Sequence, residues 1–186
     1  MYHPQCVSTG TIVKKIVPGA VVRCIGSPGN IELLGILGAA VTPCCAVKYP
    51  IYAGQHYRAG TLYVYDKTMY QPEGECGPGR YGTLYVKYAT YGGSDYKDGY
   101  IGAWKGFTEY HLHVADEPEG FNPVRTFSKK LGWGNPIPGQ FEYSEEYDTI
   151  KTDTGWIEVE ICGYENSDAY IAAHSVMWWC GHSQAK

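Results

Sequence analysis

The chain has 186 residues, of which 44% are hydrophobic, so it can bury a sizeable core and is not expected to be disordered. The formal net charge is −4, and no run of Lys and Arg exceeds two residues. Because binding to nucleic acid needs a basic patch, we expect no nucleic-acid partner. The 24 Gly, 18 Tyr and 11 Pro residues favour short strands and turns over helices.

The first ten residues, MYHPQCVSTG, contain neither the basic nor the apolar region of a signal peptide. The longest uncharged stretch, residues 33–47, is broken by Pro43 and is too short to span a membrane as a helix. We therefore expect a chain made in a cytoplasm, without a membrane partner. The seven cysteines include no C-x-x-C pair, so we expect most of them to be reduced and buried.

Residues 11–41 contain three apolar segments, separated by turn signals at Pro18-Gly19 and at residues 27–30. This pattern predicts strand, turn and strand. The third segment is compatible with a helix by composition, but its two central glycines would each cost a helix about 1 kcal/mol, so we favour a bent strand.

The next feature is a repeat. RAGTLYVYDKTMY (residues 58–70) and RYGTLYVKYATY (residues 80–91) share the motif Gly-Thr-Leu-Tyr-Val, and a Gly- and Pro-rich loop at 71–79 separates them. Alternation with period 2 predicts two strands, each with one aliphatic and one polar or aromatic side. The aliphatic side would carry Leu62, Val64, Leu84, Val86 and Tyr88; the other would carry Thr61, Tyr63, Tyr65, Thr83, Tyr85 and Lys87.

The second half is also rich in strand signals. We expect a polar, aromatic loop at 91–106, a strand at 107–114, a loop at 115–123, a short strand near 124–128 and an irregular segment at 129–148. WIEVEI predicts an amphipathic strand with Ile157, Val159 and Ile161 pointing inward, whereas 169–179 fits a strand or a short helix.

These elements predict a mainly β protein, a sandwich or barrel-like antiparallel architecture with long Gly- and Tyr-rich loops and little helix. We expect one domain over residues 1–186. A change of composition near Gly92 leaves open a division into two β lobes, 1–92 and 93–186.

Aromatic side chains crowd the middle of the chain. Exposed Tyr and Trp bury much area at low entropic cost, so they make good contact surfaces for proteins or sugars. We expect a partner-contact surface that includes Tyr63, Tyr65, Tyr85, Tyr96, Tyr100 and Trp104.

Two other functions are open. Glu109, His111 and His113 would share one face of a strand, and two imidazoles with a carboxylate are a possible ligand set for a metal-dependent hydrolase. A carbohydrate-binding module would use the regions of Trp104, Trp133 and Trp156. The chain contains no G-x-S-x-G, Walker A or Rossmann glycine pattern, and we expect a protein without catalytic activity or cofactor.

The stretch IYAGQHYRAGTLYVYDKTMYQP (residues 51–72) has Gly54-Gln55 followed by Ala-Gly-Thr-Leu at 59–62. It resembles the central hairpin of bacteriophage head decoration (capsid cement) proteins, and IELLGILGAAV (residues 31–41) is similar to an apolar strand of that family. The resemblance implies a small all-β protein without an active site, often a trimer, that sits on an assembled capsid. On this basis we expect a structural virion protein that contacts capsid or other virion proteins and forms a homo-oligomer.

Overall fold

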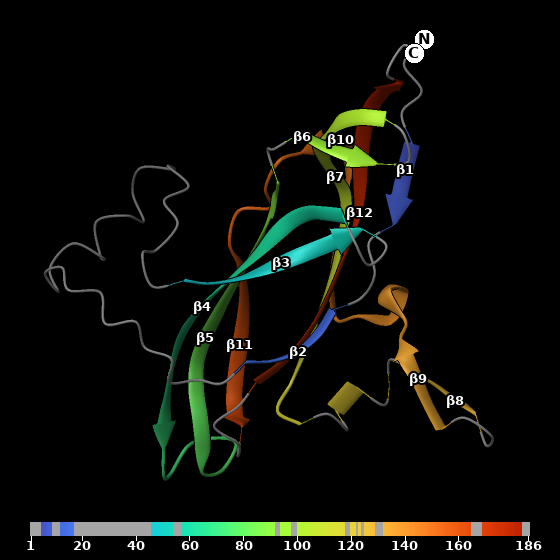
Figure 1. The fold of residues 1–186 in the computed structure, drawn as a ribbon. Helices are drawn as coiled ribbons and strands as arrows, with labels where there is room; N and C mark the ends of the chain where they lie inside the picture. Colours follow the sequence, from blue (N-terminus) through green and yellow to red (C-terminus); the bar gives the residue numbers. More distant parts are fainter. Residues whose placement is uncertain are drawn as a thin grey trace, which may run out of the picture.

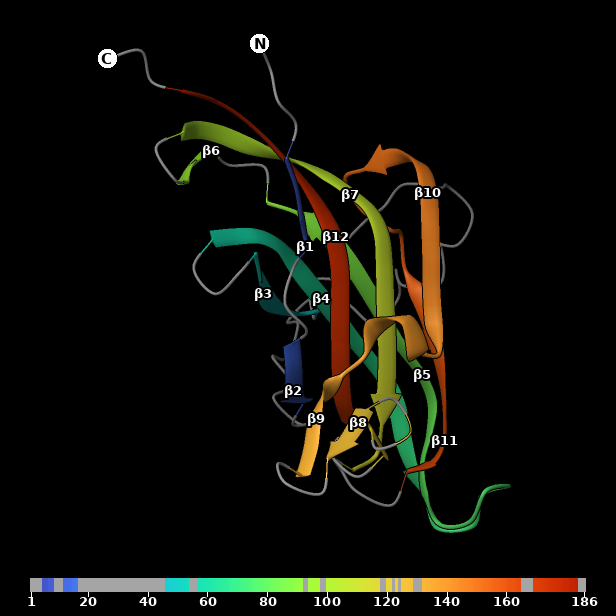
Figure 2. The same ribbon diagram turned by 90° about the vertical axis from the view of Figure 1, so that its right-hand side faces the viewer.

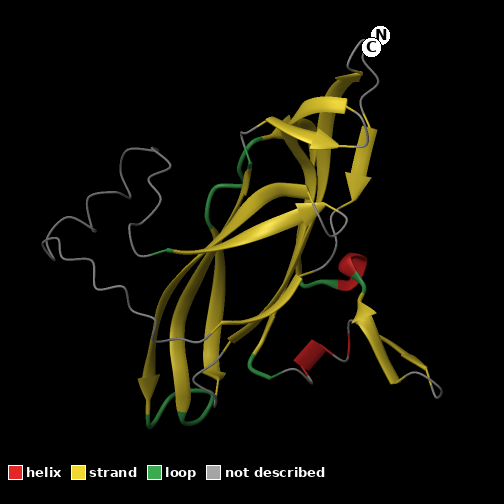
Figure 3. Cartoon of the chain, in the orientation of Figure 1, coloured by secondary structure: helices red, strands yellow, loops and turns green. Residues whose placement is uncertain are grey.

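A computed structural model describes residues 5–8, 12–16, 46–53, 57–91, 94–97, 100–117, 120–121, 123, 125–128, 132–164 and 169–183. Strands dominate these residues, and the short helical segments among them, red in Figure 3, are 3-10 turns and not α-helices. The expectation of a mainly β protein is confirmed. The strands form two antiparallel sheets that are consistent with a sandwich and are not closed into a barrel.

The larger sheet, here called sheet A, has the order β1-β12-β7-β10; β2 also pairs with β12, and β6 pairs with β7. Its strands are β1 (Gln5–Ser8), β2 (Ile12–Ile16), β6 (Ser94–Lys97), β7 (Tyr100–Ala115), β10 (Tyr143–Lys151) and β12 (Ala169–Ser183). Figure 2 shows β12, β7 and β10 running side by side.

The smaller sheet, sheet B, has the order β11-β5-β4-β3 (Figure 1). Its strands are β3 (Val47–Ala53), β4 (Tyr57–Gln71), β5 (Gly79–Thr90) and β11 (Ile157–Tyr164). A separate hairpin, β8 (Arg125–Ser128) with β9 (Gly132–Pro136), and a short 3-10 turn, η3 (Pro138–Gln140), precede β10.

The repeated motif forms the centre of sheet B. The two copies pair as β4 and β5, and Val64 lies directly opposite Val86, which is the same position of the motif. A local two-fold axis through this pair therefore relates the two copies. The predicted faces are confirmed for the aliphatic side, because Leu62, Val64, Leu84, Val86 and Tyr88 are all buried in the core.

One hydrophobic core lies between the two sheets. It combines the aliphatic side of β4 and β5 with Phe107, Leu112 and Val114 of β7 and with alternate residues of β12. The Tyr88 hydroxyl, on sheet B, donates a 2.7 Å hydrogen bond to the carbonyl oxygen of His111, on sheet A. Each sheet takes strands from both sides of Gly92, since β11 joins sheet B and β1 and β2 join sheet A.

Two segments differ from the expectation. Residues 91–106 contain β6 and the start of β7 instead of one loop, and residues 129–148 contain β9 and the start of β10. Of the two alternatives expected for residues 169–179, the strand is the one observed. Gly and Tyr suggested a loop before Gly106, but pairing with the long strand β12 overrides that weak local preference. Glycine suits position 106 of this strand, because the φ of Gly106 is +144°, a value that residues with a side chain rarely adopt.

Cys76 and Cys162 form a disulfide across 86 residues of sequence, so the expectation of reduced cysteines is wrong for this pair. It fastens the turn between β4 and β5 to β11. The same turn folds against Tyr81, whose hydroxyl accepts a hydrogen bond from the Cys76 N–H at 2.8 Å and donates one to the Gly77 carbonyl. Cys180, a free cysteine on β12, is partly buried.

Candidate interaction face of the four-stranded sheet

The side of sheet B that faces away from sheet A, here called the outer face, carries the tyrosines of the repeat. Tyr63, Tyr65 and Tyr85 are half-buried there. Tyr65 lies opposite Tyr85 across the ladder between β4 and β5, and their ring centroids are 6.1 Å apart at an interplanar angle of 33°. Neighbouring strands therefore present their rings as a pair, as an antiparallel cross-strand position requires.

Lysines occupy the positions between these rings. The Lys67 ammonium lies 5.8 Å from the centroid of Tyr65 and 5.4 Å from that of Tyr85. The Lys87 ammonium lies 5.2 Å from the Tyr63 ring and 5.1 Å from the Trp156 ring. These distances fall within the range in which a cation is attracted to an aromatic face.

Lys87 is unusually buried for a lysine, with 5% of its surface exposed. Its position opposite Tyr63, together with Trp156 just before β11, explains how the aliphatic stem is covered. On the other flank, the Lys48 ammonium of β3 lies 5.5 Å from the same Tyr63 ring. The row Lys48, Tyr63, Lys87 and Trp156 thus runs across β3, β4 and β5 to the residue that precedes β11.

Both signs of charge occur on this face. Lys48 and Lys67 are exposed on β3 and β4, whereas Glu158 and Glu160 are exposed on β11. Glu158 is opposite Tyr85 in the ladder between β11 and β5. A surface of paired aromatic rings with flanking charges is suited to contact with another macromolecule, because little side-chain entropy remains to be lost.

The six predicted contact residues do not form one surface. Tyr63, Tyr65 and Tyr85 come together on the outer face, but Tyr96 and Tyr100 lie on β6 and β7 of sheet A, where the structure describes the backbone only. The prediction that Trp104 contacts a partner is wrong, because its side chain is 4% exposed and belongs to the core.

The sequence placed Lys87 on this face but gave no sign of its contact with Trp156. That contact depends on β11 pairing with β5 across about seventy residues, which no local pattern specifies. Trp133, named for a carbohydrate site, lies on β9, and its side chain is outside the part of the chain that the structure describes.

Glu109, His111 and His113 do share one side of β7, as predicted, on the side of sheet A that faces away from the core. His111 Nε2 contacts Glu109 Oε1, whereas His113 Nε2 lies 3.4 Å from the carbonyl oxygen of Gly120. Among the described residues, no group of three or more His, Cys, Asp or Glu is arranged to hold a metal ion.

His174 of β12 joins this histidine cluster, although the sequence did not connect it with β7. It lies opposite His111, with the ring centroids 5.5 Å apart. Burial, and then the proximity of His111, lower the pKa of His174 to about 4, while the Glu109 carboxylate acts in the opposite direction. Phe121 and Phe141 pack against the rings of His113 and His111, so the cluster is part of a second, smaller apolar layer.

Comparison with known proteins gives no match: no family model, curated protein or solved structure is significantly similar to this chain. In the part of the chain that the structure describes, no helix is long and apolar enough to cross a membrane.

Proposed function

We propose that this chain is a structural virion protein, a bacteriophage capsid decoration protein or a related head or tail component, that acts through protein–protein contacts. The observation that carries the proposal is the set of cation–ring contacts on the outer face. The Lys67 ammonium lies over the rings of Tyr65 and Tyr85, and the Lys87 ammonium lies over the ring of Tyr63. The hairpin resemblance at residues 51–72 supplies the class of partner, a capsid or other virion protein.

The energetics of a repeated lattice favour such a surface. A standard protein interface buries about 800 Å² on each partner. A face of four strands spaced about 4.8 Å apart, over about eight residues of about 3.4 Å each, has a flat footprint of about 500 Å², which is of the same order. Weak contacts of this size become strong binding when many copies, or a homo-oligomer such as a trimer, bind one particle.

Co-sedimentation tests the proposal. Wild-type protein is mixed with particles of the virus that carries the gene, purified without this chain, and the particles are pelleted through a cushion. We expect wild-type protein to pellet at a fixed number of copies per particle, and a Tyr65→Ser/Tyr85→Ser variant to pellet at less than a tenth of that number. Ile150→Ser, a change of an exposed apolar residue on β10 of sheet A, should pellet as wild type does.

If wild-type protein stays in the supernatant at every concentration tested, the proposal is wrong. If the double variant pellets as well as wild type does, binding occurs but does not use the outer face.

A carbohydrate-binding module is a second candidate, favoured by one observation: Trp156 and Tyr63 flank Lys87 on the outer face. Aromatic rings on the face of a sheet can stack on sugar rings. Tryptophan fluorescence should then change on addition of a polysaccharide that binds, and a glycan array without signal would exclude this function.

A further inference from the structure

β4 is longer than the strand beside it. β3 pairs with β4 only as far as Val64, opposite Val47, whereas β5 continues to pair as far as Gln71. Residues 65–71 of β4, here called the open edge, therefore have β5 on one side and no strand of the described residues on the other. Figures 1 and 2 show this end of the hairpin reaching beyond the ends of β7 and β12. Met69 and Tyr70 on it are 65% and 62% exposed.

The hydrogen-bond pattern shows which residues present their backbone to the open edge. The Ala59 carbonyl accepts a 2.8 Å bond from the Tyr91 N–H, so odd-numbered residues of β4 bond to β5. The register between β4 and β5 is unbroken from Gly60 to Gln71. In an antiparallel pair the bonding direction alternates, so Asp66, Thr68 and Tyr70 direct their N–H and C=O groups away from β5.

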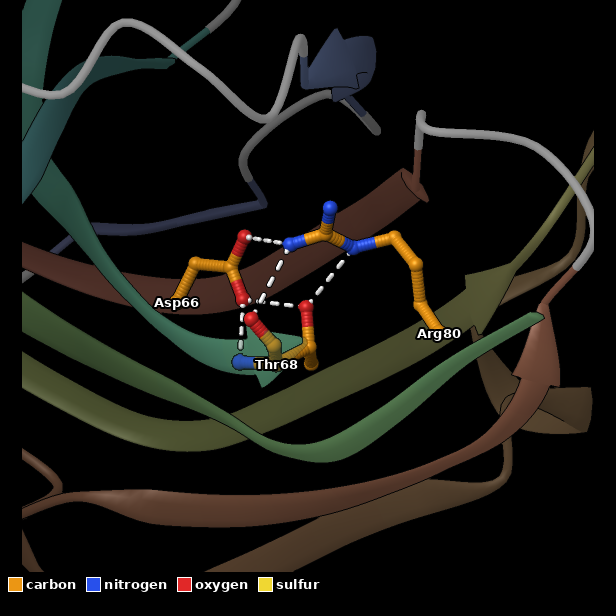
Figure 4. A network of polar contacts seen from close by, with 3 residues as sticks. All are labelled: Asp66, Thr68 and Arg80. Carbon is orange, nitrogen blue, oxygen red and sulfur yellow. Dashed lines mark hydrogen bonds and ion pairs between the residues drawn. The ribbon is translucent and has the colours of Figure 1, made fainter. Parts of the chain in front are cut away.

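The central one of these three residues is capped by side chains (Figure 4). The Thr68 N–H donates to Asp66 Oδ1 at 2.7 Å, and the Thr68 carbonyl accepts from Arg80 Nη2 at 3.1 Å. Arg80 Nε also donates to Thr68 Oγ1 at 2.8 Å, and Arg80 Nη2 pairs with Asp66 Oδ2 at 3.1 Å. Two charged side chains thus take the place that a neighbouring strand would fill, which is one way in which proteins protect a free strand edge.

We propose that the open edge is a strand-addition surface for a second copy of this chain. The Asp66 and Arg80 side chains block this surface, because they bind the N–H and the C=O of Thr68. Two copies related by a two-fold axis pair antiparallel, and only even-numbered residues direct their backbone groups toward this edge. An axis at Thr68 places Asp66 opposite Tyr70 of the second copy, and Lys67 opposite Met69. An axis at Asp66 would set two carboxylates against each other, which is unfavourable, and one at Tyr70 would pair only three residues.

The register centred on Thr68 therefore places the capped residue at the centre of the dimer, where its N–H and C=O must be free before the strands pair. The inference goes beyond the proposed function, because the edge of β4 is distinct from the outer face and the pairing needs no particle. Purified protein alone tests it.

The experiment is sedimentation velocity over a concentration series. Asp66→Ala/Arg80→Ala removes both caps and leaves the net charge unchanged. We expect this variant to dimerise at least tenfold more tightly than wild type, a change of about 1.4 kcal/mol. Adding Thr68→Pro, which removes the central N–H donor, should return the affinity to the wild-type value or below. Arg58→Ala/Glu158→Ala, a charge-neutral control in which Arg58 lies on the part of β4 that β3 covers, should behave as wild type does.

A double variant that dimerises no more tightly than wild type overturns the proposal, as does a triple variant that still dimerises like the double variant. Hydrogen exchange on the Asp66→Ala/Arg80→Ala variant gives a second test. The amides of residues 66, 68 and 70 should exchange more slowly as protein concentration rises, while those of Lys67 and Met69 should not change. Equal behaviour of the two sets would contradict strand addition at this edge.

Discussion

Removal of the disulfide between Cys76 and Cys162 should destabilise the fold by several kcal/mol. The disulfide joins residues 86 apart in sequence. The chain-entropy relation gives about 4.6 kcal/mol at 25 °C for a loop of this length, and native disulfides commonly contribute about 2–4 kcal/mol. Both cysteines are exposed, so replacement by serine leaves no buried cavity. We therefore expect Cys76→Ser/Cys162→Ser to lower the free energy of unfolding by about 2–4 kcal/mol.

Equilibrium unfolding in urea measures this change. The double variant should show a lower midpoint and a larger m-value than wild type, because the denatured chain expands when the cross-link is absent. Cys180→Ser, which alters a cysteine that is not disulfide-bonded, is the control and should change the free energy of unfolding by less than about 1 kcal/mol. A double variant within about 1 kcal/mol of wild type would refute the argument that this cross-link restrains the unfolded chain.

Three further predictions concern packing and protonation. Gly106→Ala should cost more than about 2 kcal/mol in urea unfolding, because φ is +144° and a Cβ would lie 2.1 Å from a backbone oxygen of β10; Gly139→Ala, with open space around it, should cost less than about 0.5 kcal/mol. Val64→Ala and Val86→Ala should each cost about 2 kcal/mol in the same assay, since the local two-fold axis gives them equivalent core positions; costs that differ severalfold would contradict this equivalence. The pKa of His174 is lowered in the folded state from 6.5 to about 4, so the unfolded chain binds its proton first and stability should fall as pH drops from about 6.5 to 4, by at most about 3 kcal/mol. His174→Gln should flatten that dependence, and an unchanged slope in unfolding experiments at pH 7, 5.5 and 4.5 would rule out His174 as its source.

The local pattern predicted the faces of sheet B well. Alternation with period 2 is a direct consequence of strand geometry, so the repeat specified which side of β4 and β5 would be buried. The same reasoning placed Val159 and Ile161 of β11 correctly in the core. Likewise, His111 and His113 were correctly assigned to one side of β7.

What the sequence did not reveal depends on contacts between distant segments. The pairing of β11 with β5 brings Cys162 to Cys76, and the pairing of β12 with β7 brings His174 to His111. Trp104 was expected at the surface because Gly and Tyr surround it. It is buried because β7 continues through this region as a strand, and Trp104 lies opposite Trp179 of β12.

A competition assay tests the central claim, that the outer face of sheet B binds virion proteins, most directly. Wild type and the Tyr65→Ser/Tyr85→Ser variant, mixed in equal amounts, compete for particles that lack this chain, and mass spectrometry measures the ratio in the pelleted particles. The account predicts at least tenfold enrichment of wild type, a difference of about 1.4 kcal/mol in binding free energy. A bound ratio near one, or no bound protein at all, would contradict it.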